Sequence, residues 1–215
     1  MKTLKKTKKL IVISILLLMP ALISAQRINK FYIDMPEVLN PVLSQKQRYE
    51  LLEYAKSGLG DSILNKYNQQ THIIQLDTIN NYIQVKNTES SIFEMFLFDN
   101  RSETVIGVIK TVCSPICQSY IKFYNTNWQE YPMSFDIPKA TEWIASNVEE
   151  SEKNNLQNIL SVSFISLQYN PMNKEIVAQN NTLEYLDTQE KEKVESKISK
   201  EDFTYIFHDN NWIRK

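Results

Sequence analysis

The fold class of this chain is decided by the stretch HIIQLDTINNYIQVKNTESSIFEMFLFDNRSETVIGVIKTV, residues 72–112. Its apolar runs are short and rich in β-branched and aromatic residues, and breaks rich in Asn, Asp, Ser and Thr separate them. Such runs between turn-forming residues are typical of strands in hairpins. SYIKFY, residues 119–124, continues the series after the break CSPICQ. The sequence therefore predicts an antiparallel β-meander.

Upstream of the meander, SQKQRYELLEYAKSGLG predicts an amphipathic helix over about residues 45–57. Ser44 and Gln47 fit a capping box, leucines recur at helical spacing, and Gly58 suits the helix end. The preceding segment, residues 31–43, contains two prolines, which disfavour helix at the residues before them. We therefore expect this segment to be an extended arm.

Downstream of the meander, a second helix is expected after Pro138, which suits a first helical turn. Its apolar stripe would consist of Ala140, Trp143, Ile144 and Val148. Further along, the patterns predict strands at 161–169, 175–179 and 182–186, a short charged helix at about 189–197, and a final β segment. The expected fold is thus α+β, with an antiparallel β-meander packed against two amphipathic helices.

The chain divides near residue 135 into two halves, 26–135 and 136–215, and each half ends in a similar phrase. The first phrase is FYNTNW, residues 123–128, and the second is FHDNNW, residues 207–212. The similarity is explained either by duplication of one helix-plus-meander unit or by chance, and the halves could also be parts of one continuous domain. Both explanations stay open at this point.

Each aromatic phrase also has a structural and a functional interpretation. In the structural one, 125–127 and 209–211 make tight turns, because Asn and Asp tolerate positive φ. Each Trp then starts the return strand and packs on the aromatic pair. In the functional one, four side chains form a stacking platform for a sugar or a peptide: Tyr124, Trp128, His208 and Trp212.

The amino terminus predicts export. MKTLKKTKK is basic, LIVISILLLMPALI is apolar but shorter than a membrane span, and small residues follow, which together indicate a signal peptide over residues 1–25. The formal net charge is −1, and removing the five lysines of this segment leaves about −6. Since no long basic run remains, binding to nucleic acid is not expected. We expect a periplasmic or cell-surface protein without an integral membrane segment after cleavage.

Two cysteines, Cys113 and Cys117, flank the break within TVCSPICQS. Export to an oxidising compartment favours a disulfide between them, and a hairpin would place them face to face. Unpaired thiols are one alternative. Redox chemistry is another, although CxxxC differs from the CxxC of thiol oxidoreductases.

Catalytic patterns are sparse. His72 and His208 are the only histidines, so a three-His zinc site is impossible, and neither HExxH nor GxSxG occurs. With three glycines in the chain there is no phosphate-binding Gly-rich loop. We expect no metal and no cofactor. Paired acids such as Asp34 and Glu37 could in principle serve a hydrolase, but such pairs occur in any soluble protein.

A pattern of scattered residues runs through the chain: Met35-Pro36, Pro41-Val42-Leu43, Arg48, Thr111-Val112-Cys113, Pro115, Ser119, Phe123-Tyr124 and Trp128. This pattern resembles that of an uncharacterised secreted-protein family of the Bacteroidales, a domain of unknown function. The resemblance implies a small α+β envelope protein and carries no catalytic residues. It also implies O-glycosylation at Asp-Ser/Thr followed by an apolar residue, a form that Ser62 and Thr78 fit.

The expected function is that of an exported, non-enzymatic binding or interaction module whose partner is an envelope protein or a glycan. The alternative is a secreted hydrolase that acts on envelope or dietary polymers through acidic residues.

Overall fold

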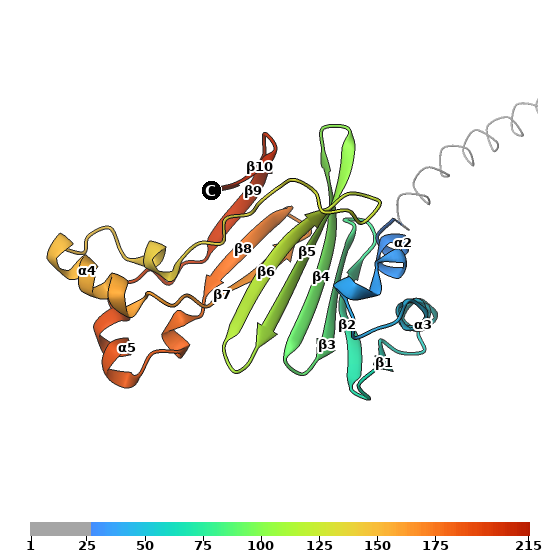
Figure 1. Ribbon diagram of the computed structural model, residues 1–215, viewed down its shortest axis with the longest axis horizontal. Helices are drawn as coiled ribbons and strands as arrows, with labels where there is room; N and C mark the ends of the chain where they lie inside the picture. The colour runs from blue at the N-terminus through green and yellow to red at the C-terminus, as the bar shows by residue number, and fades with distance from the viewer. Residues whose placement is uncertain (1–26) are drawn as a thin grey trace, which may run out of the picture.

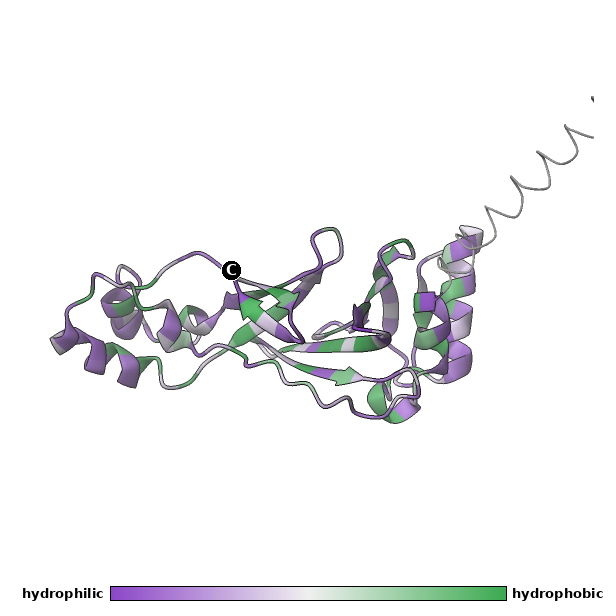
Figure 2. Cartoon of the chain, turned by 90° about the horizontal axis from the view of Figure 1, so that it is seen from above, coloured by the Kyte–Doolittle hydropathy of each residue, from purple (hydrophilic) through white to green (hydrophobic). Residues whose placement is uncertain are grey.

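The computed structural model describes residues 27–215 and shows an α+β fold with two antiparallel sheets. The predicted signal peptide lies outside the described residues. In Figure 1, helices α2 and α3 lie at one end of the molecule and α4 and α5 at the other, with the two sheets between them. Figure 2 shows that hydrophobic residues concentrate on the strands, whereas the helices at both ends are largely hydrophilic on their outer sides.

The larger sheet is the predicted meander, with six strands in the order in which they occur in the chain. Its strands are β1 (Ser62–Leu64), β2 (Gln70–Asp77), β3 (Tyr82–Thr88), β4 (Ser91–Asn100), β5 (Glu103–Cys113) and β6 (Cys117–Tyr124). Non-glycine residues make its tight turns. Asn81 and Arg101, for example, have φ values of 55° and 58°.

Two helices, α2 (Arg27–Asp34) and α3 (Gln45–Ser57), cover one face of the larger sheet. The predicted capping box of α3 is confirmed: the Ser44 side chain accepts from Gln47 N at 3.2 Å, and Gln47 Oε1 accepts from Ser44 N at 3.0 Å. Gly58 ends the helix with φ 69°, as expected. Between the helices lies a 3₁₀ turn, η1 (Glu37–Leu39).

The prediction of an extended arm over residues 31–43 is wrong at its start, because α2 continues to Asp34. Ile28 and Tyr32 lie four residues apart, so one face of this helix carries both side chains into the core. Pro36 affects only the residue before it, and the helix has already ended there.

The smaller sheet has four strands in the order β10-β9-β8-β7. They are β7 (Ile165–Asn170), β8 (Glu175–Asn180), β9 (Phe203–His208) and β10 (Asn211–Arg214). The connections contain η2 (Ala140–Trp143), α4 (Glu150–Ile159), η3 (Thr182–Glu184) and α5 (Thr188–Val194). The short charged helix is thus confirmed as α5, while the strand expected at 182–186 is a 3₁₀ turn instead.

The predicted helix after Pro138 is also wrong, because a single 3₁₀ turn occupies its first residues. Trp143 is buried by partners from the far end of the chain: its ring stacks on Phe203 at 3.8 Å and its Nε1 donates to Glu201 O at 2.8 Å. Ile144 pairs as a β-bridge with Ile198. At Ile144 the backbone is extended, because it pairs with residues far along the chain where the local apolar spacing predicts a helix.

The structure does not confirm a repeated unit. The two sheets differ in their number of strands, since the larger has six and the smaller has four. The described residues contain four α-helices rather than two. The buried hydrophobic residues form two clusters. One of them contains residues of both halves, since Phe96 and Phe123 pack there with Ile165 and Ile176.

Successive residues of β4 point to opposite faces of the larger sheet and so belong to different cores. Phe93 and Met95 pack under α2 and α3, whereas Phe96 packs against the smaller sheet. The smaller sheet approaches this second face through its edge strand β7, which lies beside β6. The two sheets therefore meet along β7.

Candidate ligand-binding cleft between the two sheets

A cleft of about 400 Å³ opens between the two sheets. Four segments that are distant in sequence form its walls: the β2–β3 turn, the end of β4, the β7–β8 turn and the β9–β10 hairpin. This volume lies within the range of about 300–1,000 Å³ that is typical of small-molecule sites. The cleft is therefore one candidate for a functional site.

Aromatic rings form one wall of the cleft. Trp212 of β10 lies 5.4 Å from Phe207 and 5.5 Å from Phe98, measured between ring centroids. Tyr169 of β7 also lines the cleft and stacks on Phe96 at 3.9 Å with an interplanar angle of 5°. Because each ring packs on another, this wall is held rigidly.

The β2–β3 turn forms the opposite rim and is organised by its own side chains. Asp77 Oδ1 accepts from the backbone N–H groups of Ile79 and Asn80, at 3.1 and 2.8 Å. Asn81 follows with φ 55°, a conformation that Asn adopts more readily than most residues. Its carbonyl accepts from Leu97 N at 3.0 Å, which fixes the turn to β4.

Two residues that line the cleft carry buried polar atoms without a hydrogen-bond partner among the described residues. These atoms are Asn81 Oδ1, an acceptor, and Trp212 Nε1, a donor. Leaving a buried polar group unpaired costs about 1–3 kcal/mol, so such groups call for an explanation. Neither atom is accessible to solvent, so a ligand in the cleft does not reach them in this conformation.

The charges that line the cleft are few and opposite in sign. Asp99 and Lys174 are its charged side chains, one from the end of β4 and the other from the β7–β8 turn. Asp99 is thus the single carboxylate among the described residues that line the cleft. A typical glycosidase has two carboxylates across its substrate, and the residues that line this cleft do not include such a pair.

Behind the aromatic wall lies Glu94 of β4, a glutamate of which only 2% is exposed. It accepts a hydrogen bond from the Tyr82 hydroxyl at 2.8 Å and another from Tyr169 N at 3.0 Å, both at Oε2. Burial raises the pKa of this carboxyl to about 7, although these hydrogen bonds favour its charged form. A lone acid within the apolar run IFEMFLF was the signal in the sequence, and our sequence analysis missed it.

Ser119 of β6 also accepts a hydrogen bond from a backbone N–H group of β7, as Glu94 does. Its Oγ accepts from Leu167 N at 2.8 Å and lies 2.7 Å from Thr111 Oγ1. Leu167 and Tyr169 are alternate residues of β7, and alternate N–H groups of a strand point to the same side. Glu94 and Ser119 therefore take the place of a neighbouring strand along the free edge of β7.

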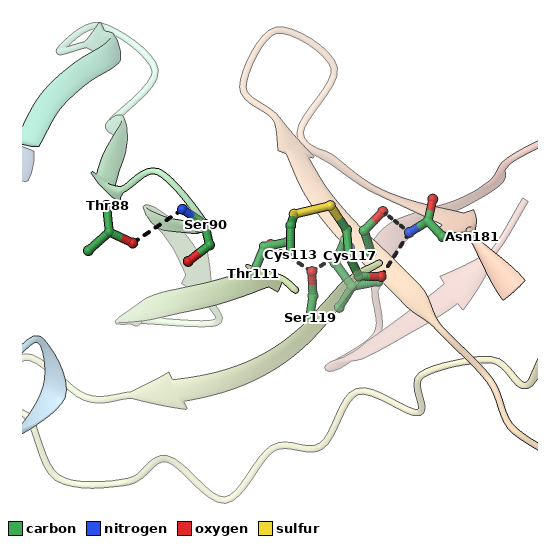
Figure 3. Close-up of a disulfide and its surroundings, with 9 residues drawn as sticks. Thr88, Ser90, Thr111, Cys113, Cys117, Ser119 and Asn181 are labelled. Atoms are coloured by element: carbon green, nitrogen blue, oxygen red, sulfur yellow. Dashed lines mark hydrogen bonds between the residues drawn. A yellow bond between two sulfur atoms is a disulfide. The ribbon is translucent and has the colours of Figure 1, made fainter. Parts of the chain in front are cut away.

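The cysteine pair lies at the same junction, as Figure 3 shows. Cys113 and Cys117 face each other at the end of the β5–β6 hairpin and form a disulfide, in the arrangement that the spacing predicts. Asn181 donates through Nδ2 to Cys117 O at 3.0 Å and to Ser166 Oγ at 2.9 Å. The tip of this hairpin is thereby tied to the smaller sheet.

The structure does not bring the four predicted platform residues together. The ring centroids of Tyr124 and Trp128 lie 5.7 Å apart in the core under α2 and α3, whereas Trp212 packs in the core between the sheets. The His208 side chain is 65% exposed beside its own turn and does not line the cleft. Of the four, only Trp212 belongs to the candidate site.

The two similar phrases fold into different turns. In FHDNNW, Asp209 and Asn210 take positive φ values of 48° and 69°, and Trp212 lies in the return strand, as predicted. In FYNTNW, Trp128 itself has φ 63° and belongs to the turn, so the prediction that it starts a strand is wrong. Asn125 organises that turn through its side chain, which accepts from the N–H groups of two later residues.

The two residues expected to carry glycans lie on the larger sheet. Ser62 is half-buried in β1, and Thr78 lies in the β2–β3 turn at the rim of the cleft. Within residues 27–215, no group of three or more His, Cys, Asp or Glu side chains is arranged to hold a metal ion. In the same range, no helix has the length and apolar character of a membrane span.

Comparison with known proteins places the chain in a family. Residues 21–212 match a family described as protein of unknown function (DUF3256). The chain belongs to the DUF3256 family. No curated protein matches it.

Among solved structures, one similar fold is that of a domain of an uncharacterized protein from Porphyromonas gingivalis W83. The TM-score is 0.75 at 19% sequence identity, and the alignment covers 87% of this chain and 96% of that one. At this identity the similarity shows the fold alone. It nevertheless agrees with the expectation of a family of unknown function with a relative in the Bacteroidales.

Proposed function

We propose that this DUF3256 protein is an exported, non-enzymatic binding module of the cell envelope and that the cleft between its two sheets is the ligand site. One observation carries the proposal: four segments that are distant in sequence form a cleft of about 400 Å³ between the two sheets, and Tyr169, Phe207 and Trp212 give it an aromatic wall. Concave pockets of this size that are lined by aromatic and apolar side chains are typical of ligand sites.

Two further features support the proposal. The cleft is lined by one carboxylate, Asp99, rather than a pair, which favours binding over hydrolysis. Export is supported by the basic and apolar amino-terminal pattern and by a disulfide, a bond that persists in oxidising compartments.

The test is a crosslinked pull-down of the tagged protein from its own cell envelope, with captured proteins and glycans identified by mass spectrometry. The Asn81→Gly, Trp212→Phe double variant changes two side chains that line the cleft while keeping the turn conformation and an aromatic ring. A matched control is Asn68→Gly with Trp128→Phe, which changes a positive-φ Asn and a Trp with an unpaired Nε1 outside the cleft.

We expect a stoichiometric partner with the natural chain and the control, and its loss with the cleft variant. Absence of any reproducible partner, or equal capture by all three proteins, would remove the proposal. Cell fractionation and the mass of the mature amino terminus test export separately, with cleavage expected before Gln26.

We also propose O-glycosylation of Ser62 and Thr78, on the strength of their Asp-Ser/Thr-Ile context. The intact mass of the protein from its native host should exceed the peptide mass by hexose units. The excess should fall in Ser62→Ala and Thr78→Ala variants. A mass equal to that of the peptide would contradict this assignment.

A further inference from the structure

We infer that the partner is a protein with an extended segment, which adds a strand to the outer edge of β10 beside the cleft. The segment carries an apolar side chain opposite Trp212 and an acidic side chain opposite Arg214. This inference rests on the proposed function and specifies the partner of the same site. It follows from the register of the β9–β10 hairpin and from the side chains and charges of β10.

The hairpin register shows which backbone groups of β10 point away from β9. A two-residue turn, 209–210, joins the strands, and residues opposite each other alternate between hydrogen-bonded and non-hydrogen-bonded pairs. Lys215 N donates to Thr204 O at 2.9 Å, so every second residue counted back from Lys215 bonds to β9. Trp212 and Arg214 lie between these residues, and their N–H and C=O groups point outwards.

The two outer strands of the smaller sheet, β7 and β10, differ in whether their edge is occupied. Along β7, Tyr169 N donates to Glu94. Leu167 N donates to Ser119, so side chains of the larger sheet occupy this edge. No strand or bridge of the described residues pairs with the outer side of β10. Since extended peptides bind by adding a strand to such an edge, β10 is the position for one.

Trp212 connects the outer edge of β10 with the cleft. It lines the cleft, and its ring centroid lies 5.4 Å from that of Phe207, its cross-strand partner. A residue that pairs with Trp212 from the outer side has its side chain on the same face of the sheet, with Cβ atoms about 5 Å apart. An apolar side chain at that position extends the row of Phe207 and Trp212 and lies beside the cleft.

Ile213 specifies a second apolar position, on the opposite face of the strand. Successive side chains of a strand point to opposite faces, and Ile213 is 42% exposed. A β-branched residue opposite Ile213 would cover part of this surface, because facing apolar side chains stabilise a strand pair.

The charge of β10 distinguishes a peptide from a second copy of this chain. Residues 211–215 include two cations, Arg214 and Lys215, and no acid. Two such edges paired with each other would gather four cations on one short ribbon, and like charges across strands are destabilising. The Arg214 side chain is 45% exposed and donates to Glu142 at 3.2 Å. Since a guanidinium has five N–H donors, it can also donate to a carboxylate of the peptide.

The probe is the peptide Ser-Thr-Glu-Val-Phe-Thr-Ser with blocked ends. Antiparallel to β10, it places its Phe opposite Trp212, its Val opposite Ile213 and its Glu opposite Arg214. Four matched peptides each change one feature. N-methylation of the Phe removes the N–H that pairs with Trp212 O, whereas N-methylation of the Val alters an N–H that points away from β10. Serine replaces the Phe in the third, and lysine replaces the Glu in the fourth.

The protein is the chain from Gln26 onward, with three variants. Arg214→Pro removes an outward N–H, and proline is tolerated at an edge strand where the lost N–H faces solvent. Arg214→Ala is its matched control, because both variants lose the guanidinium but only the proline variant loses the N–H. Lys46→Ala removes a cation that is 84% exposed on α3, on the other face of the larger sheet. Circular dichroism verifies that each variant is folded.

Fluorescence anisotropy of the labelled peptide measures affinity, and amide NMR spectra locate the site. We expect binding to shift the amide resonances of Trp212 and Arg214. N-methylation of the Phe should weaken binding roughly fivefold or more, as for the loss of one hydrogen bond. Arg214→Pro should weaken it to a similar extent relative to Arg214→Ala.

The side chains of the peptide should contribute unequally. Serine in place of the Phe should weaken binding about tenfold or more, because an apolar contact is lost. Lysine in place of the Glu should weaken it about two- to fivefold, as for an exposed ion pair. N-methylation of the Val and Lys46→Ala should each stay within about twofold. If Arg214→Pro does not fold, the two N-methylated peptides decide the result, because they leave the protein unchanged.

Three outcomes would overturn the inference: the peptide does not bind, both N-methylated peptides bind as well as the parent, or maltotetraose shifts the resonances of the cleft in its place. Dimers of the natural chain that Arg214→Pro abolishes, seen by analytical ultracentrifugation, would also overturn it, because a second copy would then occupy the edge. If the pull-down still yields a partner that depends on the cleft, the binding module stands and only the strand pairing is wrong. If the pull-down is empty as well, both are wrong.

Discussion

The two faces of the larger sheet are covered in physically different ways. On one face, helices α2 and α3 lie over Phe93, Met95 and their neighbours and enclose an apolar core. On the other face, the edge strand β7 lies over β4 and β6, and the cleft opens beside it. The first covering closes the surface, while the second leaves a candidate site.

The difference arises from where each covering element places its backbone hydrogen bonds. A helix satisfies most of its N–H and C=O groups internally, so it can lie directly on apolar side chains. An edge strand has unpaired groups along one side, and burying them requires acceptors on the opposing surface. Glu94 and Ser119 are these acceptors. A strand that covers a sheet therefore requires polar residues inside the core.

The helix-covered face buries several polar residues of its own, among them Asn29, Asn40 and Arg48, and removing Arg48 should give the largest effect. Arg48 of α3 is fully buried and donates to Leu43 O at 2.9 Å, to Ile33 O at 3.0 Å and to Met35 O. Arg48→Met should lower the free energy of unfolding by roughly 4 kcal/mol, because three carbonyls lose a charged donor. Urea unfolding measures this loss.

The matched control for that variant is Lys46→Met on the same helix, because the Lys46 side chain is 84% exposed. It should change stability by less than about 0.5 kcal/mol. An Arg48→Met variant as stable as the natural protein would show that the segment before α3 is held by apolar contacts alone.

On the strand-covered face, the tightest packing lies at Gly107 of β5. A Cβ atom at this position would overlap the ring of Phe96, which itself stacks on Tyr169. Gly107→Ala should therefore destabilise the protein by about 3 kcal/mol, the upper range for overpacking. Adding Phe96→Leu should recover part of this loss in urea unfolding. If it recovers nothing, the strain lies in the backbone of β5 and not between the two sheets.

The buried carboxyl makes the strand-covered face sensitive to pH. Because the pKa of Glu94 is raised to about 7 in the folded protein, the folded state holds the proton more tightly than the unfolded one. The stability that the folded protein gains by holding this proton is thus fully present below the ordinary glutamate pKa of 4.5 and is lost as pH rises towards 7. Glu94→Gln should remove this dependence and gain up to about 3 kcal/mol relative to the natural chain between pH 5 and pH 8.

The measurement for Glu94 is urea unfolding at several pH values between 5 and 8.5. Glu89→Gln is the matched control, since Glu89 is exposed and its hydrogen bond to Lys86 keeps its pKa below the ordinary range. That variant should follow the natural protein across the same pH values. Parallel curves for Glu94→Gln and the natural protein would mean that Glu94 titrates normally.

Much of the fold could be predicted because local patterns and long-range contacts agree there. The strands β2 to β6 alternate apolar runs with turn residues, and α3 carries its capping box in the sequence. Local pattern and long-range contact disagree at Trp143. The apolar residues there have helical spacing, but the ring of Trp143 packs on Phe203, sixty residues further along the chain. No pattern within the segment itself could have revealed that partner.

The candidate site was less predictable, because its residues come from four separate turns and strands. The sequence indicated Trp212 through its resemblance to Trp128, although the two side chains lie in different cores. Asn81 gave no signal beyond being a turn residue. Glu94 did give one, as a single acid within an apolar strand, and its meaning depends on a strand more than seventy residues away.

The smallest expected effect on stability comes from a residue at the junction of the two sheets that does not line the cleft. Ser119→Ala removes the acceptor for Leu167 N and should cost about 1 kcal/mol in urea unfolding, since a neutral hydrogen bond is lost at a buried site. Gln118→Ala, at the exposed neighbouring position, should cost less than about 0.5 kcal/mol. Ser119 does not line the cleft, so its loss should leave ligand binding unchanged while Trp212→Phe weakens it. If Ser119→Ala weakened binding as well, the attachment of β7 would control the shape of the cleft, and the site would extend along the whole junction between the sheets.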